Sequence, residues 1–504
     1  METLLATLPF LLDPSILIAA FVGVTWGILG GALPGISPSI TMALLLPFTY
    51  TMDPAAAIVI LASTYVGAEY GGSVPAILIR TPGTNAAAAT VLDGYEMNLQ
   101  GKAGLALGIS LYSGFIGSMV GLVLLMLLSA PLSSVALAFT PPAYFALGIL
   151  GLSVIATLSG DSLVKGLIAA LLGLIIATIG TDPVTGSNRF TFGSADLLGG
   201  IEPVMIMVGL FAMSELLAQA SKRGEVDKIR SRPRIEFPDW PLAKRLIPSQ
   251  LIGSAIGSFE GVMPGAGGTI ASFMSYNEAR RWSKHPEEFG KGSPEGIAAP
   301  ETANNAVAET AIIPVLSFGI PGSNSTAILL GGFLIHGLQP GPMLFEQAGD
   351  VIYGLYAGLF VAIIGMMIMG IAMLPLCVWM VNRPLPYLNA VILALILSGI
   401  YSIHGSLFDV GLMLAAGVLG FFMRMLRFPF LPTVLGLVLG FLVESNFRRS
   451  LVLSGDDYMI FVDDRISLAL LVLSALFIFG SLARRVIAAL RKENRLAFSE
   501  GSEG

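Results

Sequence analysis

Two uninterrupted apolar runs limit what this chain can fold into more than any other feature. Residues 107–130 and 351–381 contain no charged side chain. Each run is longer than the roughly 20 residues that an apolar helix needs to cross a bilayer. Charged residues make up only 12% of the chain, whereas soluble domains carry about 25%. We therefore predict an all-α, polytopic membrane protein.

Further apolar segments raise the expected number of membrane segments to about 10–12. Several of these segments are short for a full crossing, so we expect broken or re-entrant helices among them. The other candidate spans lie near residues 15–31, 55–79, 143–158, 165–180, 197–218, 387–402, 406–422, 430–443 and 466–482.

Basic residues predict the orientation, because loops rich in Lys and Arg remain in the cytoplasm. The longest polar stretch, 221–245, holds eight of them, and the segment 484–495 is basic as well. We expect a cytoplasmic linker and a cytoplasmic C-terminus. The aspartates between 456 and 464 then lie outside, and the N-terminus, with Glu2 and Asp13 but no base, is expected to be periplasmic.

The two halves of the chain share an ordered pattern of small residues and Pro-Gly pairs. GVTWGILGGALPGISPSI, from Gly23, resembles GSAIGSFEGVMPGAGGTI, from Gly253, and TPGTN (81–85) resembles IPGSN (320–324). Chance is the alternative in a chain rich in Gly and Ala, but ordered matches at both ends favour a repeat. We predict a first membrane repeat over 1–220, a cytoplasmic linker over 221–246 and a second repeat over 247–445, followed by a periplasmic loop, a last transmembrane helix and a cytoplasmic tail over 446–504.

Charges in equivalent turns indicate that the repeats are inverted. The turn around Arg383 is basic, whereas its counterpart at 129–142 has no charge. The turn with Arg424 and Arg427 is also basic, while its counterpart at 181–190 has one Arg and one Asp. Inverted-topology repeats are a hallmark of secondary transporters.

Each repeat contains two Pro-Gly breaks, at 33–39 and 81–85 in the first and at 263–269 and 320–326 in the second. Proline removes a backbone donor and glycine loosens a helix, so each pair interrupts one. Backbone freed at membrane depth must be buried or line a wet cavity. A helix that resumes there offers free N–H groups to a carboxylate.

Close helix packing by small residues is the alternative use of such glycines. We favour it for Gly23, Gly27 and Gly31, and we favour a binding site for the breaks, because they recur in both repeats. The predicted substrate-binding residues are Ser37, Ser39, Arg80, Pro82, Gly83, Thr84, Asn85, Gly267, Thr269, Gly322, Ser323, Asn324, Ser325 and Thr326.

Polar residues near the apolar stretches are functional candidates, since a charge within a membrane is costly. Glu301, Asn304 and Asn305 place three oxygen-bearing side chains within one short segment. We predict that they bind the coupling cation, together with Gly35 and Gly265 in the breaks.

Other charged residues leave two readings open. Glu69 and Glu309 lie either in the membrane interior or in polar turns at its surface. Arg80 is expected to form a charge-assisted contact with a substrate carboxylate.

The scattered histidines and the single cysteine indicate no metal site and no other cofactor, and nothing in the net charge of −6 indicates nucleic acid.

Long motifs resemble a known family: GALPGISPS, EYGGSVPAIL, ATVLDGYEMNLQGKAGLALG, APETANNAVAE and GIPGSNSTAIL. Over residues 15–480 the chain is similar to the large permease subunit of tripartite tricarboxylate transporters. The resemblance implies a bacterial inner-membrane permease that works with a small membrane subunit and a periplasmic solute-binding protein. It also implies carboxylate uptake driven by a Na⁺ or H⁺ gradient, without ATP. Arg80 departs from the family motif, which often has Asn there.

An ion or solute channel, or a membrane scaffold subunit, is the competing function. A channel would show a continuous line of polar residues along a helix, and none is evident. The zinc motif H-E-x-x-H and the phosphate loop G-x-x-x-x-G-K-[ST] are absent from the sequence, which disfavours an enzyme.

Overall fold

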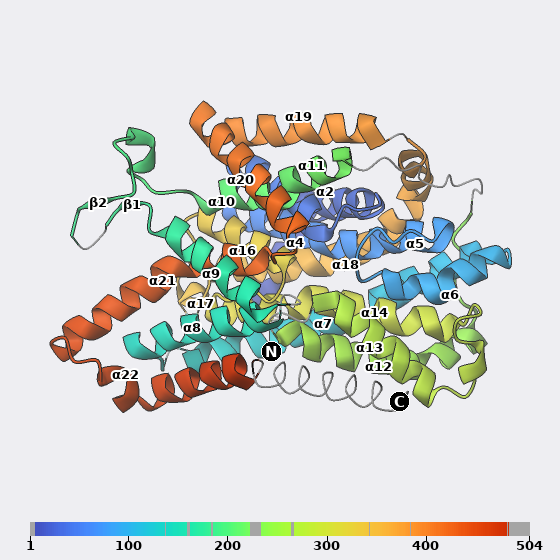
Figure 1. The fold of residues 1–504 in the computed structure, drawn as a ribbon. Coiled ribbons are helices and arrows are strands. Elements are labelled where there is room, and N and C mark those ends of the chain that lie inside the picture. The colour runs from blue at the N-terminus through green and yellow to red at the C-terminus, as the bar shows by residue number, and fades with distance from the viewer. Residues whose placement is uncertain are drawn as a thin grey trace, which may run out of the picture. The chain divides into compact units, whose positions relative to one another are not determined.

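The computed structural model consists almost entirely of helices (Figure 1). Seven helices in the described part of the chain are long and apolar enough to cross a membrane. The two apolar runs lie in α7 (Ala103–Ala136) and α18 (Gly349–Val381), so the prediction of an all-α polytopic membrane protein is confirmed. The described residues are 6–136, 138–158, 162–182, 185–221, 233–263, 267–341, 343–383, 385–480 and 482.

The chain forms two compact units, each built from two separate stretches of sequence. The first comprises Met1–Leu137 and Glu202–Phe422, and the second comprises Ala138–Ile201 and Met423–Gly504. Each unit thus draws on both halves of the sequence. The predicted linker and cytoplasmic tail fall largely at 222–232 and 483–504, outside the described residues.

The first unit contains most of the helices. In chain order they are η1 (Leu8–Leu12), α2 (Pro14–Gly31), α3 (Pro38–Leu45), η2 (Leu46–Thr49), α4 (Pro54–Gly71), α5 (Ser73–Ile79), α6 (Ala88–Leu99), α7, α10 (Pro203–Val208), η4 (Gly209–Met213), α11 (Ser214–Ser221), α12 (Trp240–Val262), α13 (Gly267–Trp282), η5 (Pro286–Glu288), α14 (Pro294–Thr310), α15 (Ile312–Phe318), α16 (Asn324–Ile335), α17 (Leu344–Gln347), α18, α19 (Leu385–His404) and most of α20 (Leu407–Met425).

The second unit is smaller. Arg189 in its strand β2 forms an ion pair of 2.7 Å with Glu444 of α21, which ties a short hairpin to that helix. The elements of this unit are α8 (Pro141–Leu158), α9 (Leu163–Ala177), the paired strands β1 (Gly180–Thr181) and β2 (Asn188–Arg189), η3 (Ala195–Leu197), α21 (Leu431–Ser454), α22 (Ile460–Asp463) and a last apolar helix over Arg465–Gly480.

Two helices, α4 and α14, form the centre of the first unit. Every residue from Ala56 to Gly71 in α4 and from Glu295 to Thr310 in α14 is buried. Helix α4 is packed by α2, α16 and α18, and α14 by α6, α7 and α12. Each central helix therefore contacts neighbours from both halves of the sequence and is shielded from lipid, which lets it carry polar side chains.

Glycines bring α2 and α4 into close contact. A Cβ atom on Gly23, Gly27 or Gly31 would clash with backbone carbonyl oxygens of α4. The interpretation of these glycines as a packing surface is confirmed. In the second half, Gly253 and Gly257 of α12 approach α14 in the same way.

Replacing Gly27 with alanine should destabilise the protein by about 1–3 kcal/mol, the typical cost of overpacking. The added methyl group would meet the carbonyl oxygen of Thr64, which cannot move without displacing α4. Thermal unfolding in detergent measures the effect. The matched control is Gly411→Ala in α20, where no atom beyond the surrounding turns of the same helix lies within 4 Å of the new Cβ among the described residues. Equal stability of the two variants would contradict the packing role.

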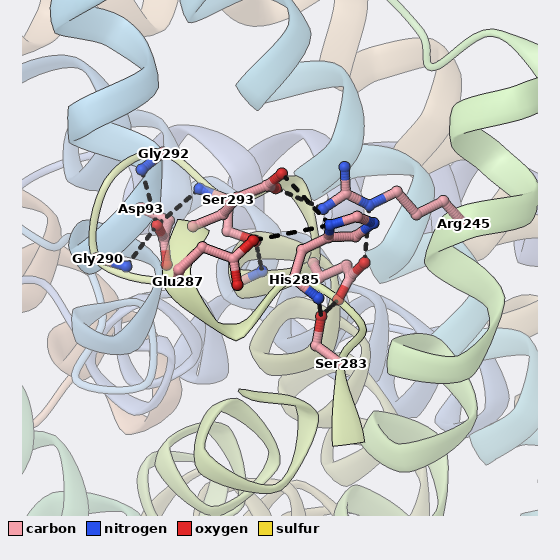
Figure 2. A network of polar contacts seen from close by, with 11 residues as sticks. Asp93, Arg245, Ser283, His285, Glu287, Gly290, Gly292 and Ser293 are labelled. Carbon is pink, nitrogen blue, oxygen red and sulfur yellow. Dashed lines mark hydrogen bonds and ion pairs between the residues drawn. The ribbon is translucent and has the colours of Figure 1, made fainter. Parts of the chain in front are cut away.

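A polar insert between α13 and α14 is held by a buried carboxylate of α6 (Figure 2). The Oδ1 atom of Asp93 accepts hydrogen bonds from the backbone N–H groups of Gly290 (2.8 Å), Gly292 (2.9 Å) and Ser293 (2.7 Å). Its Oδ2 atom accepts one from the hydroxyl of Tyr276 (2.8 Å). Asp93 is fully buried, so this residue of the ATVLDGYEMNLQ motif fastens the first half of the chain to the second.

Arg245 fixes the same insert from α12 (Figure 2). Its Nε atom donates to Glu295 at 2.8 Å, and its Nη2 atom contacts Glu288. Helices α12, α13 and α14, which lie side by side in Figure 1, are thereby joined at one end.

Candidate functional site

Both central helices are followed by the same succession of elements. Helix α4 continues as the short α5 and α14 as the short α15, and each short helix ends at a residue with left-handed backbone: Arg80 (φ 59°) and Gly319 (φ 69°). A loop containing the Pro-Gly pair then leads to α6 or α16. These helix breaks, which the Pro-Gly motifs predicted, are confirmed.

The first loop packs into the junction between α2, α4 and α5. The N–H of Gly83 donates to the carbonyl of Gly72 at 3.0 Å, and a Cβ on Gly83 would clash with the carbonyl oxygen of Gly31. The buried Thr84 side chain lies against Gly72, and its Oγ1 accepts from Ala87 N at 3.3 Å. Glycine at 83 is therefore required by space, and Thr84 closes the turn that precedes α6.

The second loop ends in a capping box at the start of α16. Ser323 Oγ accepts from Thr326 N at 3.2 Å, and Thr326 Oγ1 accepts from Ser323 N at 2.9 Å. These hydroxyls satisfy the first N–H groups of the helix. The neighbouring Asn324 is exposed, as is Asn85 at the equivalent place in the first loop, whereas Pro82 is half-buried and Gly322 and Ser325 are buried.

The central helices cross in opposite directions. Tyr65 of α4 lies beside Glu309 of α14, and Glu69 lies beside Asn304. Further along, Ser73 at the start of α5 donates to Glu301 at 2.6 Å. Increasing residue numbers on one helix therefore meet decreasing numbers on the other.

Glu301 is buried and fully engaged. Its carboxylate accepts hydrogen bonds from Ser73 of α5 (2.6 Å), Ser110 of α7 (3.0 Å) and Thr90 of α6. Sequence reasoning missed these three partners, although each is a hydroxyl within an otherwise apolar segment. The carboxylate thus joins three helices of the first half to α14.

Glu69 and Glu309 lie in the interior, with exposed fractions of 7% and 0%. The alternative that places them in surface turns is wrong. The physical reason is that Glu69 faces α14 at Asn304 and Glu309 lies against Gly121 of α7, and both places are enclosed by the surrounding helices. Nearby, Asn305 is also buried and donates from Nδ2 to the carbonyl of Glu301 at 3.0 Å.

The other predicted residues lie at the starts of α3 and α13. Ser37 caps α3, and its Oγ lies 2.8 Å from Ser39 Oγ. Gly35 lies against α11, where its Cβ position would be 3.3 Å from Gln219 Nε2, and no atom of 301–305 is within 4 Å of that position. Gly267 begins α13 and is followed by the half-buried Thr269. Gly265 lies outside the described residues.

Arg80 is exposed, and its guanidinium carbon lies 5.8 Å from the ring centroid of Tyr95 in α6. Left-handed backbone is unfavourable for Arg and easier for Gly or Asn. The equivalent residue of the second half is Gly319. The backbone at this position therefore suits Asn or Gly better than Arg.

Comparisons with known proteins give three findings. A family model described as "Tripartite tricarboxylate transporter TctA family" matches residues 17–435. An uncharacterized 52.8 kDa protein in the TAR-I ttuC' 3' region of Agrobacterium vitis is 39% identical over 460 residues, which cover 91% of this chain and 92% of that protein. An uncharacterized protein in the TAR-II ttuC' 3' region of the same organism is 37% identical over 215 residues, which cover 43% of this chain and 89% of that protein. No solved structure matches the chain.

Proposed function

Because the chain belongs to the tripartite tricarboxylate transporter TctA family, whose members are transporter subunits and not enzymes, we propose that it is the large permease of a binding-protein-dependent secondary transporter for carboxylates. A small membrane subunit and a periplasmic solute-binding protein are its proposed partners. The proposed site is the bacterial inner membrane, with the N-terminus in the periplasm and the C-terminus in the cytoplasm. The proposed driving force is a Na⁺ or H⁺ gradient.

One observation carries this proposal: the two Pro-Gly loops have equivalent positions, each after a left-handed residue and each before a new helix. Thr84 lies at Gly72, and the Ser323 side chain lies beside Tyr65 of the same helix. Both loops therefore lie beside the C-terminal part of α4. Their amide and hydroxyl groups suit an anion with more than one carboxylate and place no fixed charge in lipid.

The helix ends support inverted repeats. At the end of α16, His336 lies beside Thr49 and Asp53, which precede α4. At the end of α6, Gln100 Nε2 donates to the carbonyl of Lys291, which precedes α14. The helix that follows the Pro-Gly loop of each half, α6 or α16, thus ends where the central helix of the other half begins. A twofold axis between antiparallel halves requires this arrangement. We propose this axis lies in the membrane plane.

Cysteine labelling tests the inversion. In a Cys377→Ser background, which removes the single native cysteine, Ser134→Cys should react with an impermeant reagent added outside and Asn382→Cys should not. Permeabilised cells provide the control, because both sites should then react. Equal labelling of both sites from the outside of intact cells would sink the inverted arrangement.

Uptake into proteoliposomes tests the function. The chain, reconstituted with its small subunit, should take up labelled carboxylates only when the binding protein and an imposed Na⁺ or H⁺ gradient are present. The panel of mono-, di- and tricarboxylates identifies the substrate class. Uptake that needs ATP would refute the proposal, and non-saturable flux without an ion gradient would favour the channel alternative.

Arg80→Asn should change the order of preference among these acids if Arg80 contacts the substrate. The variant also relieves left-handed strain, so we expect it to be about 1 kcal/mol more stable. Relative uptake across the panel and thermal unfolding measure the two effects separately. If the order of preference among the acids is unchanged while the variant is more stable, Arg80 does not contact the substrate, and its contact is with Tyr95 alone.

A further inference from the structure

The carboxylates of Glu69 and Glu309 are incompletely hydrogen-bonded inside the protein; the polar side chain beside Glu69 is Asn304, and the one beside Glu309 is Ser118. Glu69 Oε2 and both carboxylate oxygens of Glu309 are buried without a hydrogen bond. Among the ion pairs of the described residues, none includes either side chain. An uncompensated charge in a protein interior costs several kcal/mol. Both groups therefore require a positive partner or a proton.

Neutral side chains that carry oxygen atoms lie near the two carboxylates. Asn304 is 2% exposed and lies beside the Glu69 carboxylate, but neither of its amide atoms makes a hydrogen bond of good geometry. Tyr65 is electrostatically coupled to Glu69 and, less strongly, to Glu309. Glycines leave room for these side chains: a Cβ on Gly121 would be 3.0 Å from Glu309 Oε2, and one on Gly268 would be 2.6 Å from Asn304 Oδ1.

Glu301 differs from this pair. Hydroxyls of Ser73, Thr90 and Ser110 already bind its carboxylate. Charge-assisted hydrogen bonds of this kind stabilise an ionised carboxylate without a cation. The unsatisfied oxygens therefore lie on Glu69 and Glu309, and Glu301 holds the surrounding helices.

We propose that Glu69, Glu309 and Asn304 form a buried centre that binds a hard monovalent cation such as Na⁺. Carboxylate, amide and hydroxyl oxygens are the ligands that hard cations prefer. A proton would need one carboxylate alone and would leave the amide of Asn304 without a role. The inference deepens the proposed function, since the bound ion would be the coupling ion.

The position of the centre explains how ion and substrate would be coupled. Tyr65 lies beside Ser323 at the end of the second loop and beside Ser325 in the first turn of α16. Asn304 lies at the Gly268 Cβ position, whose other neighbour, at 3.5 Å, is the Cβ of Ala86 in the first loop. An ion in the centre thus fixes groups beside both loops, and a substrate that needs those loops ordered would bind better when the ion is present.

Cation-dependent stability tests the centre without any transport. The purified chain is unfolded thermally in NaCl, KCl or choline chloride at constant ionic strength and pH. Because a ligand that binds only the folded state raises its stability, we expect Tm to rise saturably by several degrees with Na⁺ and to rise less with K⁺. Glu69→Gln and Glu309→Gln should each raise the Na⁺ concentration needed for half the effect at least tenfold.

The matched control is Glu260→Gln, which removes a buried carboxylate of α12 that is not part of the centre. It should retain the Na⁺ response of the unmodified chain. If a glutamine variant fails to fold, the thermal assay is replaced by a measurement of ²²Na⁺ binding to the unmodified chain and to the Asn304→Ala variant. Asn304→Ala should then weaken Na⁺ binding at least tenfold.

Three results would overturn the centre: a Tm that does not respond to Na⁺, a response that both glutamine variants retain, or a response to pH alone. In the last case Glu69 and Glu309 would be protonated carboxyls. Other titratable groups near them could contribute to such a pH response. These are Tyr65 and Glu301, and, beside Glu301, Tyr70 and Cys377. Na⁺ binding without carboxylate uptake would refute the proposed function and leave the centre intact. Carboxylate uptake without Na⁺ binding would refute the centre and leave the proposed function intact.

Discussion

Asn324→Leu should lower carboxylate uptake roughly 10- to 100-fold while the protein still assembles in the membrane. The side chain is exposed at the first position of α16, where an amide can donate to a carboxylate. Loss of a hydrogen bond to a charged group costs about 1.5–3 kcal/mol. Leucine keeps the approximate size and removes the donor, so the effect should lie in substrate affinity.

Thr84→Val should have a similar effect in the first loop, because it removes the hydroxyl and keeps the branched shape. Thr84 also accepts from Ala87 N, so thermal unfolding must accompany the uptake assay. The matched controls are Thr25→Val, whose hydroxyl bonds only to its own helix at Phe21 O in the described contacts, and Asn446→Leu in α21. Near-normal uptake by both loop variants would remove the loops from the substrate site.

Asp93→Ala should destabilise the protein by at least about 3 kcal/mol, because several charge-assisted hydrogen bonds of roughly 1.5–3 kcal/mol each are lost together. The three N–H groups of Gly290, Gly292 and Ser293 would be left without their acceptor. Water that enters the space left by the side chain can accept some of these hydrogen bonds. The summed free energies of the separate hydrogen bonds are therefore an upper limit on the destabilisation.

Thermal unfolding and limited proteolysis of the insert at 283–293 measure this effect. Glu96→Gln on the same helix is the control, because Glu96 is half-buried and makes no hydrogen bond to the insert in the described contacts. The Asp93 variant should be cleaved in the insert at protease concentrations that leave the control intact. A variant that unfolds and is cleaved like the control would show that the insert is held by other contacts.

The sequence by itself determined the class of protein and the places where helices break. Apolar runs such as 351–381 satisfy the length of a bilayer without any tertiary contact, and they became α18 and its counterpart α7. Proline and glycine act on the local backbone, so the breaks after α5 and α15 could be read from TPGTN and IPGSN. The packing role of Gly27 also followed from spacing alone, because glycines four residues apart share one helix face.

Only the tertiary structure decided which polar residues meet. Glu69 and Glu309 carry no sequence signal that separates a buried carboxylate from one in a surface turn. Burial depends on the antiparallel crossing of α4 and α14, whose residues are far apart in sequence. For the same reason the sequence grouped Glu301 with Asn304, whereas Glu301 is bound by hydroxyls of three other helices and Asn304 lies beside Glu69 of α4. Hydrogen-bond satisfaction is a property of neighbours in space, and local sequence does not encode it.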